Sequence, residues 1–133
     1  MNVSQSLCVY LRQMALQVSL LNVMKENWLG LIKKKFPSFR HGRVFGDSVK
    51  HAKPDPEIYL KACEAIGTEP VHSIALEDAP AGIRSASAAG MIPVMIPDLA
   101  QPDEEVRGLC RYVYPTLLDV IKMLDRENAE AGR

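Results

Sequence analysis

The chain has 133 residues, 47% of them hydrophobic, so its length and composition suit one globular domain with one core. Its 16 basic and 16 acidic residues cancel, which argues against nucleic acid and anionic membrane surfaces as partners. Three widely spaced cysteines without a CxxC pair predict neither a disulfide framework nor a zinc site. We therefore expect a cytoplasmic protein. No apolar run approaches the ~20 residues of a membrane span.

Helical and strand patterns alternate along most of the chain. In chain order they predict a helix at 4–14, a strand at 16–21, a helix at 24–35, a strand at 43–46, a helix at 54–66, a strand at 73–76, a helix at 80–89, strands at 92–96 and 112–114, and a helix at 115–124. Pro54 is expected to open the third helix and Gly67 to end it, because proline suits a first turn and glycine a C-terminus. The inner face of that helix would consist of Ile58, Tyr59, Ala62, Cys63 and Ile66. Residues after Arg126 have the composition of a polar tail, so we expect a core domain at 1–126 and a tail at 127–133.

This alternation predicts an α/β fold with a parallel sheet and helices on both faces. In such sheets ligands bind at the carboxyl ends of the strands. Polar residues follow four of the expected strands, namely Asn22, Asp47, Glu77 with Asp78, and Asp98. We expect them to share one rim of the sheet.

The adjacent acids Glu77 and Asp78 end the clearest strand pattern, just before a helix. Mg²⁺ prefers carboxylate oxygens and keeps several waters, so the pair could supply one ligand directly and one through water. The alternative is an N-cap, since an aspartate before Pro80 would suit the start of the helix. One cap needs only one carboxylate, and here there are two in an apolar context.

Lys53 lies in a loop that Pro54 and Pro56 make stiff. A stiff loop positions an ammonium well, and an ammonium is a compact partner for a phosphate or carboxylate oxygen. The alternative is an exposed lysine in a turn. Asp47 could orient Lys53 or the water shell of a metal, or it could be a plain turn residue.

Together these motifs resemble the haloacid dehalogenase superfamily of phosphohydrolases. KPDPEIYL at 53–60 is similar to the third motif of that family, and EDAPAGI at 77–83, followed by AAGM at 88–91, is similar to its fourth. GDSV at 46–49 also fits the branch that includes β-phosphoglucomutase and small sugar-phosphate phosphatases. The resemblance runs from about residue 43 to residue 98 and implies a three-layer, Rossmann-like core.

The resemblance also implies roles for these residues. Lys53 would hold the transferring phosphoryl group as a catalytic residue, Asn22 would bind phosphate, and Asp78, helped by Glu77, would hold Mg²⁺. The family attacks phosphorus with an aspartate carboxylate, and a metal with a lysine would offset the negative charge that gathers there.

Two departures from the family pattern limit the expected activity. Residues 1–46 contain no aspartate, so the opening Asp-x-Asp motif is absent, and Asn22 stands where the family has serine or threonine. The central first strand of the sheet and the helical cap are then expected to be missing. That loss would leave the strands at 16–21 and 73–76 on either side of a gap. The two strands would close it, self-association or a complementing chain would fill it, or the protein would be only marginally stable.

These observations support a Mg²⁺-dependent phosphatase or phosphomutase domain for a small phosphorylated metabolite, truncated and inactive alone. A fragment of a longer enzyme is one form of this hypothesis. The alternative is a non-catalytic module that binds phosphate, a metal or another protein.

Overall fold

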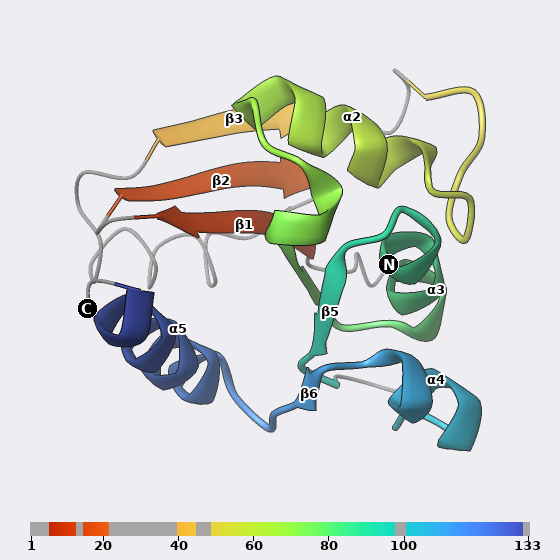
Figure 1. Ribbon diagram of the computed structural model, residues 1–133. Helices are drawn as coiled ribbons and strands as arrows, with labels where there is room; N and C mark the ends of the chain where they lie inside the picture. Colours follow the sequence, from red (N-terminus) through yellow and green to blue (C-terminus); the bar gives the residue numbers. More distant parts are fainter. Residues whose placement is uncertain (1–5, 13–14, 22–39, 45–48, 98–100, 132–133) are drawn as a thin grey trace.

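The computed structural model describes residues 6–12, 15–21, 40–44, 49–97 and 101–131 (Figure 1). Within these residues six strands form one sheet in the order β3-β2-β1-β4-β5-β6. The strands are β1 (Ser6–Arg12), β2 (Ala15–Leu21), β3 (Arg40–Val44), β4 (Ile74–Glu77), β5 (Ile92–Met95) and β6 (Tyr112–Val113). The helices are α2 (Glu57–Ile66), α3 (Pro80–Ala88), α4 (Glu104–Leu109) and α5 (Leu117–Ala131), with a short 3-10 turn, η2, at Pro70–His72.

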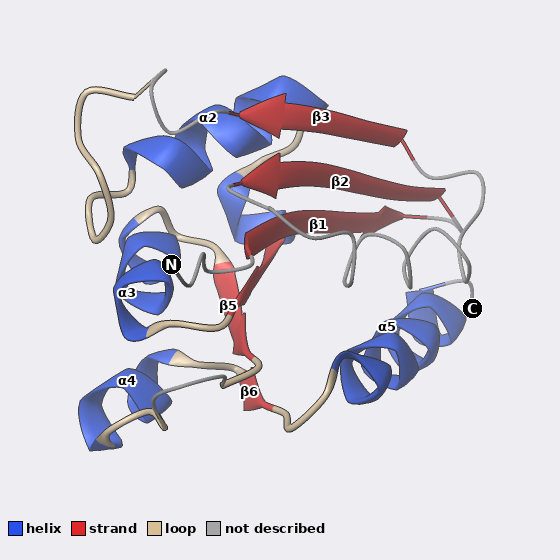
Figure 2. Cartoon of the chain, turned by 180° about the vertical axis from the view of Figure 1, so that it is seen from behind, coloured by secondary structure: helices blue, strands red, loops and turns tan. Residues whose placement is uncertain are grey.

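The helices lie on both faces of the sheet, which confirms the predicted α/β fold (Figures 1 and 2). Helices α2, α3 and α4 cover one face, and α5 lies across the sheet from them (Figure 2). Two apolar clusters join α2, α3 and α4 to the sheet. One contains Ile58, Tyr59, Ala62, Cys63, Ala75, Ala86, Ala89 and Met91, and the other contains Ile83, Met95 and Val106.

Strand β1 is the main departure from the sequence prediction, because residues 4–14 were expected to form a helix and that expectation is wrong. β1 runs antiparallel to β2 on one side and to β4 on the other. Its apolar residues fit a helical period and a short buried strand equally well, and hydrogen-bonding partners on both sides decide in favour of the strand. The expected gap between β2 and β4 is therefore filled by the chain's own first strand.

The other five strands run parallel to one another. β2 pairs parallel with β3, and β4, β5 and β6 form a second parallel set. Both sets have the same direction because β1 is antiparallel to β2 and to β4. Their carboxyl ends are in register along one rim. The row consists of Val44, Leu21, Ser6, Glu77, Met95 and Val113, in which Ser6 is the amino end of β1.

Two helix boundaries differ from the sequence prediction. α2 begins at Glu57 rather than at Pro54, because residues 52–55 form a turn in which Asp55 N–H donates to the Ala52 carbonyl. The peptide bond between Lys53 and Pro54 is cis. α5 continues to Ala131, through the segment after Arg126 for which a polar tail was expected.

The strand expected at 43–46 is observed as β3 at Arg40–Val44, so its start was predicted three residues too late. Gly67, with φ of 68°, ends α2 as expected. α4 has no counterpart in the sequence prediction, and its first turn is capped by the Asp103 carboxylate, which accepts from Val106 N–H. The helix expected at 24–35 lies outside the described residues. Within the described residues no helix is long and apolar enough to cross a membrane.

Candidate functional site

The structure brings Lys53 and Glu77 into direct contact at the carboxyl end of β4. Lys53 Nζ donates to Glu77 Oε1 over 2.6 Å. The Glu77 side chain is fully buried, and that of Lys53 is 15% exposed. This excludes the interpretation of Lys53 as an exposed lysine in a turn.

Tyr59 shares the same carboxylate oxygen. Its hydroxyl donates to Glu77 Oε1 over 2.5 Å, and its ring lies 5.6 Å from Lys53 Nζ, within the range of a cation–π contact. Among the described residues, the other oxygen of Glu77, Oε2, is buried without a hydrogen-bond partner. A buried carboxylate oxygen in that state costs free energy unless a ligand meets it.

Strand geometry explains why Glu77 points toward the helices. Ala75 and Glu77 are two residues apart on β4 and therefore face the same side of the sheet. Ala75 belongs to the cluster of α2 and α3, so Glu77 lies over the same face. There its carboxylate meets Tyr59 of α2 and the first turn of α3, where a negative charge is favoured by the helix dipole.

Gly82 gives the carboxylate its space. A Cβ atom at this position would lie 1.9 Å from both Cδ and Oε2 of Glu77. Real side chains do not approach so closely, so the position of Glu77 requires a residue without a Cβ atom in the first turn of α3.

Asp78 follows Glu77 and is 6% exposed. The N-cap of α3 is Ala79, so Asp78 lies one residue before the cap position that the alternative interpretation gave it. Two residues with carboxylate side chains, Glu77 and Asp78, are thus buried at the end of β4, and the first of them contacts the ammonium of Lys53.

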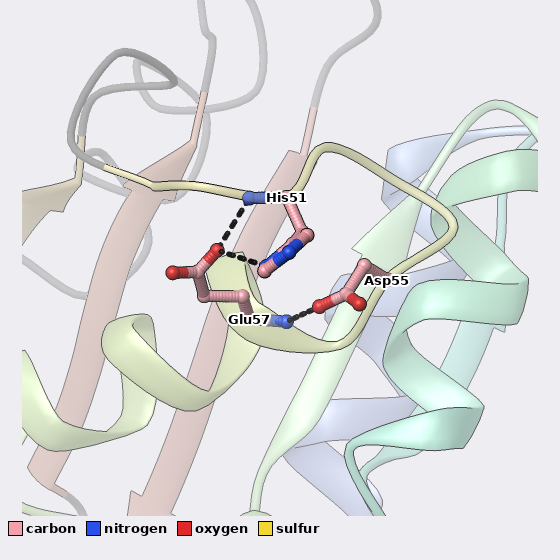
Figure 3. A group of neighbouring side chains, drawn as sticks. All are labelled: His51, Asp55 and Glu57. Atoms are coloured by element: carbon pink, nitrogen blue, oxygen red, sulfur yellow. Dashed lines mark hydrogen bonds and ion pairs between the residues drawn. The ribbon is translucent and has the colours of Figure 1, made fainter.

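The loop that carries Lys53 is held by a network of His51, Asp55 and Glu57 (Figure 3). His51 N–H donates to Glu57 Oε2 over 2.6 Å, and Glu57 N–H donates to Asp55 Oδ1 over 2.9 Å. The Ser85 hydroxyl of α3 donates to the Asp55 carbonyl over 2.6 Å. These bonds fix both ends of the loop against α2 and α3 and so position Lys53.

His51, Asp55 and Glu57 each offer one atom that could bind a metal ion, a ring nitrogen or a carboxylate oxygen. These atoms lie within 4.8 Å of one another, a spacing that could admit a cation. The group already has a structural function, because its carboxylates accept from backbone N–H groups. Hydrogen bonds from the backbone of Lys50 and His51 also lower the pKa of Glu57. The sequence assigned no site to these residues.

Sequence reasoning missed three residues that shape the site. Tyr59 was assigned to the apolar face of its helix, although a buried tyrosine hydroxyl normally requires a polar partner and could have signalled the contact. Gly82 and Ser85 stood among the small residues of α3 and gave no separate signal. Asn22 and Asp47, which the sequence placed in the site, lie outside the described residues.

A family model described as haloacid dehalogenase-like hydrolase matches residues 10–90, more than half of the chain. The chain belongs to this family. Sugar-phosphate phosphatases and β-phosphoglucomutase-like proteins are among the relatives and structural neighbours of this haloacid dehalogenase-like chain, which confirms the branch expected from the motifs.

Three comparisons show the extent of the similarity. Validoxylamine A 7'-phosphate phosphatase of Streptomyces hygroscopicus subsp. limoneus is 49% identical over 51 residues, which cover 38% of this chain and 24% of that protein. Phosphorylated carbohydrates phosphatase of Thermotoga maritima is 46% identical over 48 residues, 36% of this chain and 22% of that protein. The crystal structure of CbbY from Rhodobacter sphaeroides in complex with phosphate superposes with a TM-score of 0.54 at 28% identity, over 63% of this chain and 36% of that one. The chain thus spans about a quarter of the length of the first two relatives.

Proposed function

We propose that this haloacid dehalogenase-like chain carries the phosphate- and cation-binding part of a phosphatase or phosphomutase site for a small phosphorylated metabolite. The contact of Lys53 with the buried Glu77, beside Asp78, carries the proposal. Three relatives of the chain are named for phosphorylated sugars or related compounds, which supports a sugar phosphate as the ligand class.

The residues at the end of β4 fit a Mg²⁺ ion. Glu77 Oε2 is a buried oxygen without a hydrogen-bond partner among the described residues, and Asp78 supplies a second buried carboxylate. Mg²⁺ takes carboxylate oxygens and retains waters. The formal charge of Lys53, Glu77 and Asp78 is minus one, so a divalent cation would reverse its sign and favour a phosphate.

Each residue then has a defined task. Lys53, held by Glu77, would donate an N–H to a phosphate oxygen, since an ammonium has three donors and Glu77 Oε1 accepts one of them. Glu77 and Asp78 would hold the cation. The cation would supply positive charge next to the phosphate oxygens, where negative charge gathers during transfer.

We further propose that the chain alone does not hydrolyse phosphate esters. Residues 1–46 contain no aspartate, and the central position of the sheet is occupied by β1, which runs against its neighbours. The same observation favours the second candidate, a non-catalytic module that binds the cation and the phosphate. A complementing chain would have to displace β1 or supply its aspartate from outside the sheet. We propose the cytoplasm as the compartment of the chain, because its three cysteines form no CxxC pair and suggest no disulfide framework.

Calorimetry with Mg²⁺, combined with an aryl phosphate assay, tests the proposal. We expect the chain to bind Mg²⁺, and Asp78→Asn to weaken binding at least tenfold because a direct carboxylate ligand becomes neutral. The matched control is Asp119→Asn on α5, across the sheet, which should leave the affinity unchanged. Hydrolysis should be negligible in every sample.

The outcomes separate the two parts of the proposal. The absence of Mg²⁺ binding would overturn the cation site and with it the ligand role of Asp78. Rapid hydrolysis by the chain alone would overturn only the claim of inactivity. If the chain binds Mg²⁺ and a sugar phosphate but shows no turnover even when a complementing chain is added, the result would favour the non-catalytic module.

A further inference from the structure

Glu77 has two oxygens with different surroundings. Oε1 accepts from both Lys53 Nζ and the Tyr59 hydroxyl, whereas Oε2 has no hydrogen-bond partner among the described residues. The ammonium of Lys53 and the hydroxyl of Tyr59 thus donate to the same oxygen of Glu77 rather than to one oxygen each. This asymmetry leaves one oxygen with two hydrogen-bond donors and the other with its lone pairs unused by the described residues.

Tyr59 is placed to maintain this asymmetry. It is fully buried on the inner face of α2, where Ile58 and Ala62 pack beside it in the same cluster. A ring so enclosed has little freedom to move, so its hydroxyl is a fixed donor. Lys53 is longer and more flexible, and alone it could follow the carboxylate to either oxygen.

We propose that Tyr59 is a positioning residue for the cation site, because its phenol holds Oε1 of Glu77 together with Lys53 and so leaves Oε2 as the oxygen that meets a divalent cation. This inference rests on the proposed function. It assigns the two oxygens of one carboxylate to two tasks: Oε1 anchors the ammonium, and Oε2 binds the metal. Gly82 contributes the space, since any Cβ atom there would overlap Oε2.

The test compares Mg²⁺ affinity, measured by calorimetry, in the wild type and Tyr59→Phe. The variant removes only the hydroxyl, so the ring and its packing remain. We expect Mg²⁺ affinity to fall about tenfold or more, the usual effect of losing a group that orients a metal ligand. Tyr112→Phe on β6 makes the same chemical change at a ring that stacks on Tyr114, and it should change the affinity less than twofold.

A loss of stability alone must be distinguished from a loss of positioning. Ile83→Val shortens a fully buried side chain in the neighbouring cluster and should lower the unfolding midpoint without changing Mg²⁺ affinity. A second readout is the ¹³Cδ resonance of Glu77, assigned by its absence in Glu77→Gln. We expect it to shift in metal-free Tyr59→Phe but not in Tyr112→Phe or Ile83→Val.

Each outcome has one meaning. If the wild type binds no Mg²⁺, the cation site of the proposed function is wrong and this inference falls with it. If the wild type binds Mg²⁺ and Tyr59→Phe binds it within twofold, only the role of Tyr59 is overturned. An unchanged Glu77 ¹³Cδ resonance in Tyr59→Phe would overturn the shared hydrogen bond itself.

Discussion

Glu77 shows how much of the site depends on contacts that residue types alone do not reveal. The resemblance to the haloacid dehalogenase family implied that Lys53 and the acidic pair share one site, whereas the residue patterns alone left a turn lysine and a helix cap as alternatives. The sequence could not show that Glu77 points toward α2 and α3, since that follows from its register with Ala75. The partner hydroxyl of Tyr59 was hidden for the same reason, as its helical face was predicted only to be apolar.

Gly82→Ala should destabilise the protein, because the added Cβ atom would lie 1.9 Å from Glu77 Cδ and the carboxylate would have to move. We expect a loss of about 1–3 kcal/mol in the free energy of unfolding, the usual effect of overfilling a packed site. Urea denaturation measures it.

The matched control for this substitution is Gly108→Ala in α4. A Cβ atom at Gly108 has nothing within 4 Å, and alanine is favoured over glycine in a helix by up to about 1 kcal/mol. Opposite signs for the two variants are expected, and equal effects would show that Glu77 does not depend on the space at Gly82.

At the scale of elements, the sequence placed most strands well and misplaced the start of α2 and the end of α5. Strands β2, β4 and β5 lie within one residue of their predicted bounds, because short apolar runs with sharp polar ends leave little choice. The start of α2 was misplaced by three residues. Pro54 suits a first helical turn, but the turn closed by Asp55 and Ala52, together with Asp55 Oδ1 accepting from Glu57 N–H, delays the helix to Glu57.

Glu57 links the Lys53 loop to α2 through its carboxylate, and this link should depend on pH. Hydrogen bonds from the backbone of Lys50 and His51 lower the pKa of Glu57 from its ordinary value of 4.5. A lowered pKa in the folded state means that the stabilisation is complete above the unfolded pKa and is lost as the pH falls through the folded value.

Glu57→Gln should therefore be less stable than the wild type near neutral pH, and the difference should shrink as the pH falls below 4.5. Urea denaturation at a series of pH values from about 7 to about 3 measures it. A difference that stays constant over that range would contradict the proposed hydrogen bonds to the Glu57 carboxylate.

At the scale of the whole molecule, the sequence predicted the layers and the common rim but not what lies at the centre of the sheet. The alternation of patterns is enough for an α/β fold, since parallel strands need helical connections. The partner of an individual strand is a long-range property. Residues 4–14 could therefore be assigned to a helix, although their backbone pairs with both β2 and β4.

Hydrogen–deuterium exchange tests the position of β1. With neighbours on both sides, its central amides, such as those of Cys8 and Val9, should exchange about as slowly as those of β4. The peptide that covers η2 serves as the exposed reference, because Val71 and His72 lie at the surface. Exchange in β1 as fast as in that peptide would exclude the six-stranded order.

Residues 1–46 contain no aspartate that could attack phosphorus. The direction of β1 also determines where such a carboxylate could be introduced by protein engineering. Only the first residue of the strand, Ser6, stands in the row with Leu21 and Glu77. Arg12, at the other end, is about 20 Å away along the strand at roughly 3.3 Å per residue. An acid introduced near the start of β1 would enter the neighbourhood of Lys53, whereas one at its finish would emerge on the opposite side of the protein. The direction of the strand therefore decides at which end of β1 an introduced acid could lie near the site.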